Sequence, residues 1–524
     1  MSYPSPREID WLPKGAGAWL YQLVVRRTLP LFLTAGALVA VYLPLAVRRS
    51  AWSDDYPMIL NGFTDGLLSD MRPVEVLFSF AFLHFVNEIS DLSLLRFVGV
   101  IGIAFFAVAV EHLLETWGIR SIQAVPIAIS VGLLPGFHLA AGWATTFFLA
   151  WLFMFGGLTG MWCLKGLSEG HRTPVAFGFI GMVTTLLFYP PAALFCWGLL
   201  GVRTAIKPIG ARAMVRDLGR LVLLLGIAAI TAFAIAEVIN QILDVQRSAR
   251  SALISTVPDA ITKVTWFVKH PIGTAARPFL ISSPTDAIAL ATAGPVLIIT
   301  VVGLYLRQKG SALDRIAATA LLLVYLCLTM GVHLVAIENQ IEYRYMIGIT
   351  FTMWLYFLIA LNQLRTAVIA RLDSRRGSSG DYVAPSRISV MLLGVVILSA
   401  AWSARTNINQ VFIEPFQSKE VYLKQALEPF DPNVHPQIVV LNEHSLWPSR
   451  LNLGVFSTVS DLAHPWVVEA NIRLLLKESG FEAATIPIDV VAPELAAERN
   501  GLTVDLQPYA KRLRSLVPAD ELRP

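Results

Sequence analysis

The chain has 524 residues, of which 55% are hydrophobic and only 15% are charged, and its formal net charge at pH 7 is +4. Soluble domains carry about 25% charged residues, so this composition excludes an ordinary soluble protein. The small net charge does not indicate a nucleic-acid binder. The three cysteines stand inside apolar runs and predict neither a disulfide framework nor a metal site.

Apolar runs of roughly 16 to 22 residues recur along the chain, close to the length that crosses a hydrocarbon core of about 30 Å. They predict an all-α polytopic membrane protein with spans near residues 30–47, 95–113, 122–137, 142–163, 174–189, 190–205, 220–239, 287–306, 316–335, 345–361 and 388–404, eleven in all. Lys and Arg collect on the cytoplasmic side of membrane proteins. The basic loops 203–220, 307–315 and 365–387 therefore predict a cytoplasmic N-terminus and periplasmic loops 48–94 and 240–286.

The segment 73–89, "PVEVLFSFAFLHFVNEI", allows two interpretations. Its apolar core is short and it contains Glu75, His84 and Glu88, so we interpret it as helices lying along the outer membrane face. As a further span, it would place the C-terminal region in the cytoplasm instead of the periplasm.

Residues 405–524 change character, because their apolar runs shorten to strand length in "PQIVVLN" and "TIPIDVV". Between these runs, "PWVVEANIRLLLKESG" predicts a helix that ends with Gly480 as its C-cap. We therefore expect a transmembrane domain over residues 1–404 and a small periplasmic α/β domain over 405–524, which has the usual size of a domain.

Two adjacent carboxylates, Asp54 and Asp55, follow the first predicted span in the motif "SDDY". Such a pair can simply mark the water side of a membrane boundary. The same loop, however, continues to Asp70, Arg72 and Glu75. A positioned Asp can take the proton of an attacking hydroxyl, and Arg can stabilise a phosphate leaving group through two hydrogen bonds. The loop therefore favours chemistry on an anionic, lipid-linked substrate.

These motifs resemble a known group of enzymes. An acidic pair in the first outer loop of a polytopic protein is similar to the GT-C superfamily of glycosyltransferases. The stretches "SDDY", "MRPVEVLFSFAF", "FYPPAALF" and "YRYMIGI" most resemble the Gtr-type serotype-converting glucosyltransferases, the glucosyltransferase II family, over most of residues 30–405. That family usually has a glycine where this chain has Met71, before Arg72 and Pro73.

The resemblance implies an inverting hexosyltransferase of the bacterial inner membrane that needs no metal or other cofactor. Its donor would be a polyprenyl-phosphate sugar, with glucose as the first choice. Its acceptor would be a surface polysaccharide such as O-antigen, or a lipid-linked acceptor, reached from the periplasmic face among the membrane lipids. Asp54 or Asp55 would be the general base, Arg72 would contact donor or acceptor, and Arg344 in "EYRY" would hold the donor phosphate.

An arginine that snorkels to the interface would look the same as Arg344 in sequence. Further substrate-binding candidates lie beside these motifs, at predicted outer helix ends or in the long outer loop; they are Glu75, Tyr343, Tyr189, His138, Lys269, His270 and Arg277. The alternative function is a transporter or flippase of lipid-linked sugars, although the chain shows no obvious internal repeat of the kind many transporters have. A scaffold for cell-wall assembly is a third possibility, without a positive sign in the sequence.

Overall fold

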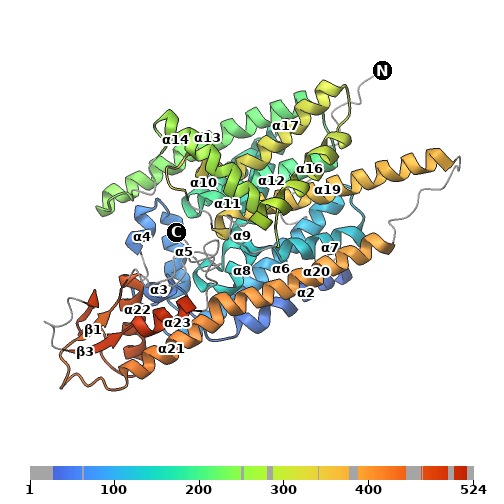
Figure 1. The fold of residues 1–524 in the computed structure, drawn as a ribbon. Helices are drawn as coiled ribbons and strands as arrows, with labels where there is room; N and C mark the ends of the chain where they lie inside the picture. The colour runs from blue at the N-terminus through green and yellow to red at the C-terminus, as the bar shows by residue number, and fades with distance from the viewer. Residues whose placement is uncertain are drawn as a thin grey trace.

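The computed structural model describes residues 28–61, 64–248, 253–279, 287–339, 342–376, 387–443, 462, 464–493 and 501–515. In these ranges the chain forms a bundle of helices with a small sheet near its C-terminal end (Figure 1). The helices follow one another in the order α2 (Thr28–Ala46), α3 (Asp55–Asn61), α4 (Thr64–Ser69), α5 (Pro73–Leu83), α6 (Leu92–Thr116), α7 (Ser121–Gly132), α8 (Pro135–Gly142), α9 (Leu149–Glu169), α10 (Arg172–Phe188), α11 (Pro190–Ala193), α12 (Phe195–Ile206), α13 (Ala211–Leu243), α14 (Val257–Phe267), α15 (Gly273–Ala275), α16 (Ala287–Arg307), α17 (Ala312–Leu328), α18 (Gly331–Val335) and α19 (Tyr343–Arg376).

The membrane character is confirmed by length and apolar composition. Within the described residues, six helical stretches are long and apolar enough to cross a bilayer: Leu29–Ala46, Ile89–Thr116, Ala144–Glu169, Ala211–Leu243, Tyr343–Arg371 and Met391–Leu427. The pair α7 and α8 makes a seventh candidate, bent by 60°; Pro135 starts α8 and has no N–H to continue the preceding helix. Each of the eleven predicted segments is mostly helical, but several, among them 122–137, 142–163 and 316–335, contain a break between two helices. The number of crossings stays a prediction.

The outer helices of the bundle expose apolar side chains. Phe32 on α2, Ile230 on α13 and Leu398 on α20 (Arg387–Ile408) are each more than 70% exposed. In α6 and α9, by contrast, most side chains are buried in the bundle. Soluble monomers rarely expose such extended apolar surface, so these outer faces are suited to contact with lipid.

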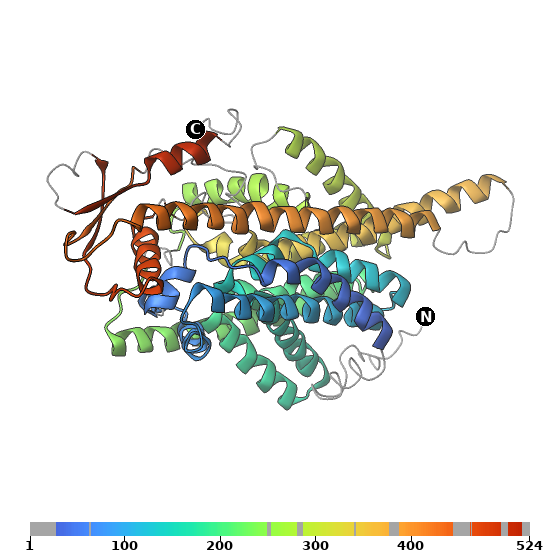
Figure 2. The ribbon, with the colours of Figure 1, turned by 90° about the horizontal axis from the view of Figure 1, so that it is seen from below.

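A continuous helical stretch links the bundle to the C-terminal region. α20 passes through a π-helical turn, Asn409–Ile413, directly into α21 (Glu414–Leu427). Figures 1 and 2 show this stretch running along the bundle and ending beside the sheet. The predicted domain boundary at residue 405 therefore falls inside a helix that belongs to both parts.

The C-terminal region contains a three-stranded parallel sheet. β1 (Ile438–Leu441) lies between β2 (Ile488–Val491) and β3 (Leu502–Asp505), in the order β2–β1–β3. α22 (Pro465–Glu478) connects β1 to β2, and α23 (Gln507–Ser515) follows β3. The two predicted strands and the predicted helix are present, and Gly480 follows α22 with φ +87°, a conformation that favours glycine. β3 was not predicted.

Candidate active site

A polar cavity of about 530 Å³ opens at the end of the bundle that contacts the C-terminal region. Its lining comes from elements that are far apart in the sequence: the turn before α3, the α4–α5 turn, the segment after α8, the end of α10, the start of α19 and the start of α22. The charged and aromatic side chains of the lining are Asp54, Asp70, Arg72, Glu75, Trp143, Phe148, Tyr189, Glu342, Arg344, Tyr345, His464 and Trp466.

The two adjacent carboxylates have different surroundings. Asp55 is fully buried, and its carboxylate oxygens accept hydrogen bonds from the backbone N–H groups of Trp52 (2.8 Å) and Thr145 (2.9 Å). Asp54 is partly exposed, lines the cavity and accepts a hydrogen bond from the Ser53 hydroxyl. Asp54 can therefore reach a substrate, whereas Asp55 fastens the turn before α3 to the segment after α8.

Burial is also the main influence on the acidity of Asp55. Loss of hydration raises its pKa to about 7, against the opposing effects of its two backbone hydrogen bonds and of nearby Arg96. The guanidinium of Arg96 on α6 is itself buried and donates to the carbonyl oxygens of Ala46, Arg48 and Ser50. Arg96 thus holds the chain between α2 and the acidic pair.

Two arginines and two tyrosines form a continuous row in the cavity wall. The guanidinium of Arg72 lies 5.0 Å from the ring centre of Tyr189, which is stacked on Tyr345 with ring centres 6.2 Å apart. The guanidinium of Arg344 lies 4.9 Å from the Tyr345 ring and 5.0 Å from that of Trp143. Cation–π contacts of this kind fix the positions of both guanidinium groups.

Each of the two arginines also pairs with a carboxylate. Arg72 pairs with Glu75 at 2.7 Å, and Arg344 pairs with Glu342 at 2.5 Å. Desolvation raises the pKa of Glu75 to about 7, partly offset by the positive charges of Arg72 and Arg344. The field of Asp54 also reaches both Glu75 and Arg344, so the base candidate and the cationic groups share one electrostatic environment.

Met71 turns the chain from α4 into α5. Its φ is +63°, and the N–H groups of Met71 and Arg72 bond back to the carbonyl oxygens of Leu68 and Leu67. This is the left-handed closure that usually ends a helix at a glycine. The side-chain amide of Asn240 on α13 supports the turn by donating to the carbonyl oxygen of Leu68. Met71 therefore adopts a strained conformation at the position where the family named above usually has glycine, and Arg72 follows it directly.

An apolar groove of about 390 Å³ adjoins the polar cavity. Phe148 lines both, and Phe78 from α5 and Phe188 from α10 line the groove beside it. The groove follows α9 as far as Trp162, a rise of roughly 21 Å along the helix axis. The Nε of Arg72 donates to the carbonyl oxygen of Phe188 at 3.3 Å, which places the cationic part of the cavity at the head of the groove.

The structure brings together some of the predicted site residues and separates others. Asp54, Arg72, Glu75, Tyr189 and Arg344 line the cavity, and Asp55 lies directly behind it. The remaining candidates do not line it: Tyr343, His138, Lys269, His270 and Arg277.

Several of these outlying candidates have local contacts that fit a structural role. The ring Nε2 of His138 lies 3.1 Å from the carbonyl oxygen of Leu133, and the Nε of Arg277 donates to the carbonyl oxygen of Gly273. Tyr343 is buried in the bundle. Lys269 and His270 lie in a π-helical turn, Val268–Ile272, after α14.

Several residues that line the cavity were not site candidates in the sequence, among them Trp143, Thr145, His464 and Trp466. Trp143 stands at the start of a predicted span, and Trp466 stands in the first turn of a predicted helix, directly after His464 and Pro465. No spacing in the sequence connects either position with Asp54, because the contacts join segments about 90 and 400 residues away.

Comparison with known proteins adds no family. No family model and no curated protein matches the chain. In the part of the chain that the structure describes, no group of three or more His, Cys, Asp or Glu side chains is placed to hold a metal ion. The chemistry that the site supports follows from its own charges and shape.

Proposed function

We propose that this protein is a membrane glycosyltransferase that moves a hexose, glucose first, from a polyprenyl phosphate to a surface polysaccharide such as O-antigen. One observation carries the proposal: an accessible carboxylate, Asp54, shares a cavity with Arg72 and Arg344, and an apolar groove shares the wall residue Phe148 with that cavity. A lipid-linked sugar phosphate has the same three parts, namely a sugar, an anionic phosphate and an apolar chain.

The reaction assigns a role to each charge. The hydroxyl oxygen of the acceptor attacks the anomeric carbon and forms the new glycosidic bond, while the bond from that carbon to the phosphate oxygen breaks. Asp54 takes the hydroxyl proton. The bonding electrons leave with polyprenyl phosphate, whose negative charge Arg72 and Arg344 stabilise. Attack from the face opposite the phosphate inverts the anomeric configuration, and the phosphate needs no proton to leave.

The groove supports a lipid carrier rather than a soluble sugar nucleotide. Its lining is almost entirely aromatic and aliphatic, from Phe78 and Phe148 to Trp162. Burying an isoprenoid chain there removes apolar surface from contact with the polar headgroup region. The phosphate at the end of the chain would then meet Arg72, which is bonded to Phe188 at the head of the groove.

Charge distribution supports the proposed sidedness. At the ends of α6, α12 and α16, Lys207 donates to the carbonyl oxygen of Thr116, and Arg307 donates to those of Ala205 and Ile206. The basic loops at these ends belong in the cytoplasm by the positive-inside rule. We propose eleven crossings of the bacterial inner membrane, with the cavity and the C-terminal region on the periplasmic side.

A transporter of lipid-linked sugars is the second candidate, favoured by the bent pair α7 and α8, since broken helices often form transport sites. Transport would move the lipid-linked sugar without breaking a bond. Purified protein in nanodiscs, supplied with polyprenyl-phosphate [¹⁴C]glucose and candidate glycan acceptors, separates the two. We expect labelled glycan and free polyprenyl phosphate. Intact donor after prolonged incubation, with glucose and with the other common hexoses, would contradict the transferase.

A further inference from the structure

The C-terminal region contributes two aromatic side chains to the cavity. His464 precedes α22 and Trp466 lies in its first turn; their rings are stacked, with centres 5.8 Å apart and planes inclined by 24°. Both line the cavity, and Trp466 is 42% exposed. A broad aromatic face that is open to a polar cavity can stack on the C–H face of a pyranose ring while the sugar hydroxyls stay hydrated.

His464 and Trp466 lie on the Asp54 side of the cavity, away from the groove that we assign to the lipid donor. The apolar groove is lined by residues of α5, α6, α9 and α10, and Arg72 directly precedes α5. α22 instead packs on α3, the short helix that begins at Asp55, directly after Asp54. The aromatic pair therefore approaches the cavity from the side of the general base, where the attacking hydroxyl must enter.

α22 is held rigidly in this position, because it belongs to two apolar cores. Val467, Ala470 and Leu474 join the core of the bundle. Val468, Ile472 and Leu475, on another face of the same helix, join the core beneath the sheet. An ordinary surface helix has only one apolar face, so this pattern fixes the helix between both parts of the protein.

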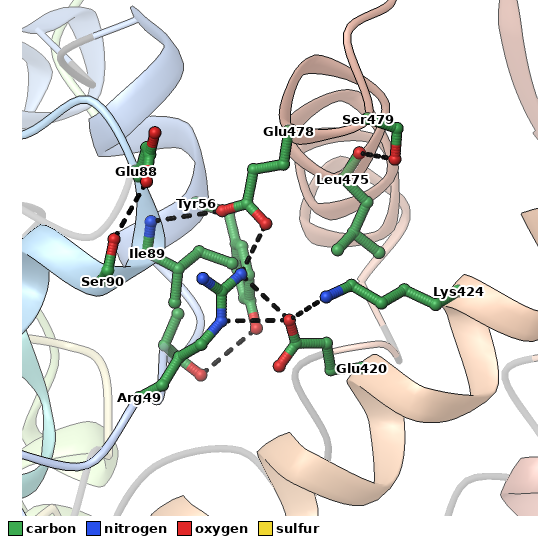
Figure 3. A network of polar contacts seen from close by, with 11 residues as sticks. Arg49, Tyr56, Glu88, Ile89, Ser90, Glu420, Lys424, Leu475, Glu478 and Ser479 are labelled. Carbon is green, nitrogen blue, oxygen red and sulfur yellow. Dashed lines mark hydrogen bonds and ion pairs between the residues drawn. The ribbon is translucent and has the colours of Figure 1, made fainter.

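An ionic cluster fastens the far end of α22 (Figure 3). Arg49, in the chain that leads to Asp54, contacts Glu478 of α22 at 2.5 Å and Glu420 of α21 at 2.9 Å. Glu478 also accepts from the backbone N–H of Ile89, and Lys424 pairs with Glu420 at 2.8 Å. The loop that carries the general base and the helix that carries Trp466 are thus tied to each other.

We infer that His464 and Trp466 form the acceptor subsite, which binds a pyranose unit of the glycan next to the hydroxyl that is glycosylated. The assignment of this subsite to the acceptor rests on the proposed function, but the binding of a pyranose can be measured without any turnover. It gives the C-terminal region a role in recognising the acceptor.

The test uses the full chain in detergent and saturation-transfer NMR with the methyl glycosides of glucose, galactose, mannose, rhamnose and N-acetylglucosamine. We expect saturation of at least one glycoside by the wild type and by Trp466→Phe, and its loss in Trp466→Ala. Trp402→Ala is the matched control, since Trp402 is 76% exposed on α20 and does not line the cavity. In the transfer assay, Trp466→Ala should raise the KM for the acceptor about tenfold and leave the KM for the donor unchanged.

Equal saturation in the wild type and Trp466→Ala, or none in the wild type, overturns the inference. So does a transfer-competent Trp466→Ala protein with an unchanged KM for the acceptor. If the wild type transfers no sugar yet binds a glycoside through Trp466, the proposed function fails and the pyranose site stands.

Discussion

Asp54 and Asp55 give the sharpest prediction. Their surroundings differ, so substitution of Asp54 should lower catalysis and substitution of Asp55 should lower the stability of the fold. Asp54→Asn removes a proton acceptor from a partly exposed cavity position and should lower kcat by about 10²- to 10⁴-fold. Asp55→Ala leaves the backbone N–H groups of Trp52 and Thr145 buried without their acceptor. At about 1–3 kcal/mol for each such group, the fold should lose roughly 2–6 kcal/mol.

The stability comparison is made at pH 6. Since the pKa of Asp55 is raised to about 7, the carboxyl is mostly neutral there, and removing it does not also remove the cost of burying a charge. We expect a lowered midpoint of thermal unfolding for Asp55→Ala and an unchanged midpoint for Asp54→Asn, with transfer from polyprenyl-phosphate glucose measured on the same preparations. Wild-type transfer by Asp54→Asn, or an inactive Asp55→Ala protein with wild-type thermal stability, would refute the assignment.

Three more outcomes concern the cationic side of the cavity and its turn. Arg344→Gln should lower kcat/KM by about 10²- to 10³-fold, and Arg344→Lys by less, since Lys keeps the charge but not the paired donors; equal losses in the two variants would contradict a contribution of the charge and leave only the paired guanidinium donors. Because the pKa of Glu75 is raised to about 7, Glu75 loses its charge and its hold on Arg72 as the pH falls from 8 to 6. The donor KM should fall over this range in the wild type and stay constant in Glu75→Gln; a persistent pH dependence would exclude Glu75 as its source. Since Met71 has φ +63°, Met71→Gly should be more stable than Met71→Ala by about 1–2 kcal/mol and should unfold at a higher temperature. The reverse order would show that the turn relaxes.

Local patterns determined much of this protein. The apolar runs predicted the helices, since the length that crosses a bilayer can be recognised in a single segment. The strands at 438–441 and 488–491 and the helix between them were likewise predictable from local periodicity and the glycine that follows. The acidic pair, Arg72 and Arg344 were found because charge next to an apolar run is conspicuous. β3 was missed although it is as long as β1 and β2, because "LTVD" alternates apolar and polar residues and forms no apolar run.

Only the tertiary structure decided which charges act together. Asp54 and Asp55 are adjacent and chemically identical. They differ because the segment around Thr145, about 90 residues away, packs against Asp55 and its backbone N–H donates to that carboxylate, whereas Asp54 lines the cavity. The same long-range packing places Trp466 in the cavity and leaves Lys269 and Arg277 outside its lining. Helix and strand formation depend on neighbouring residues, whereas burial and electrostatic environment depend on which distant segments the fold brings into contact.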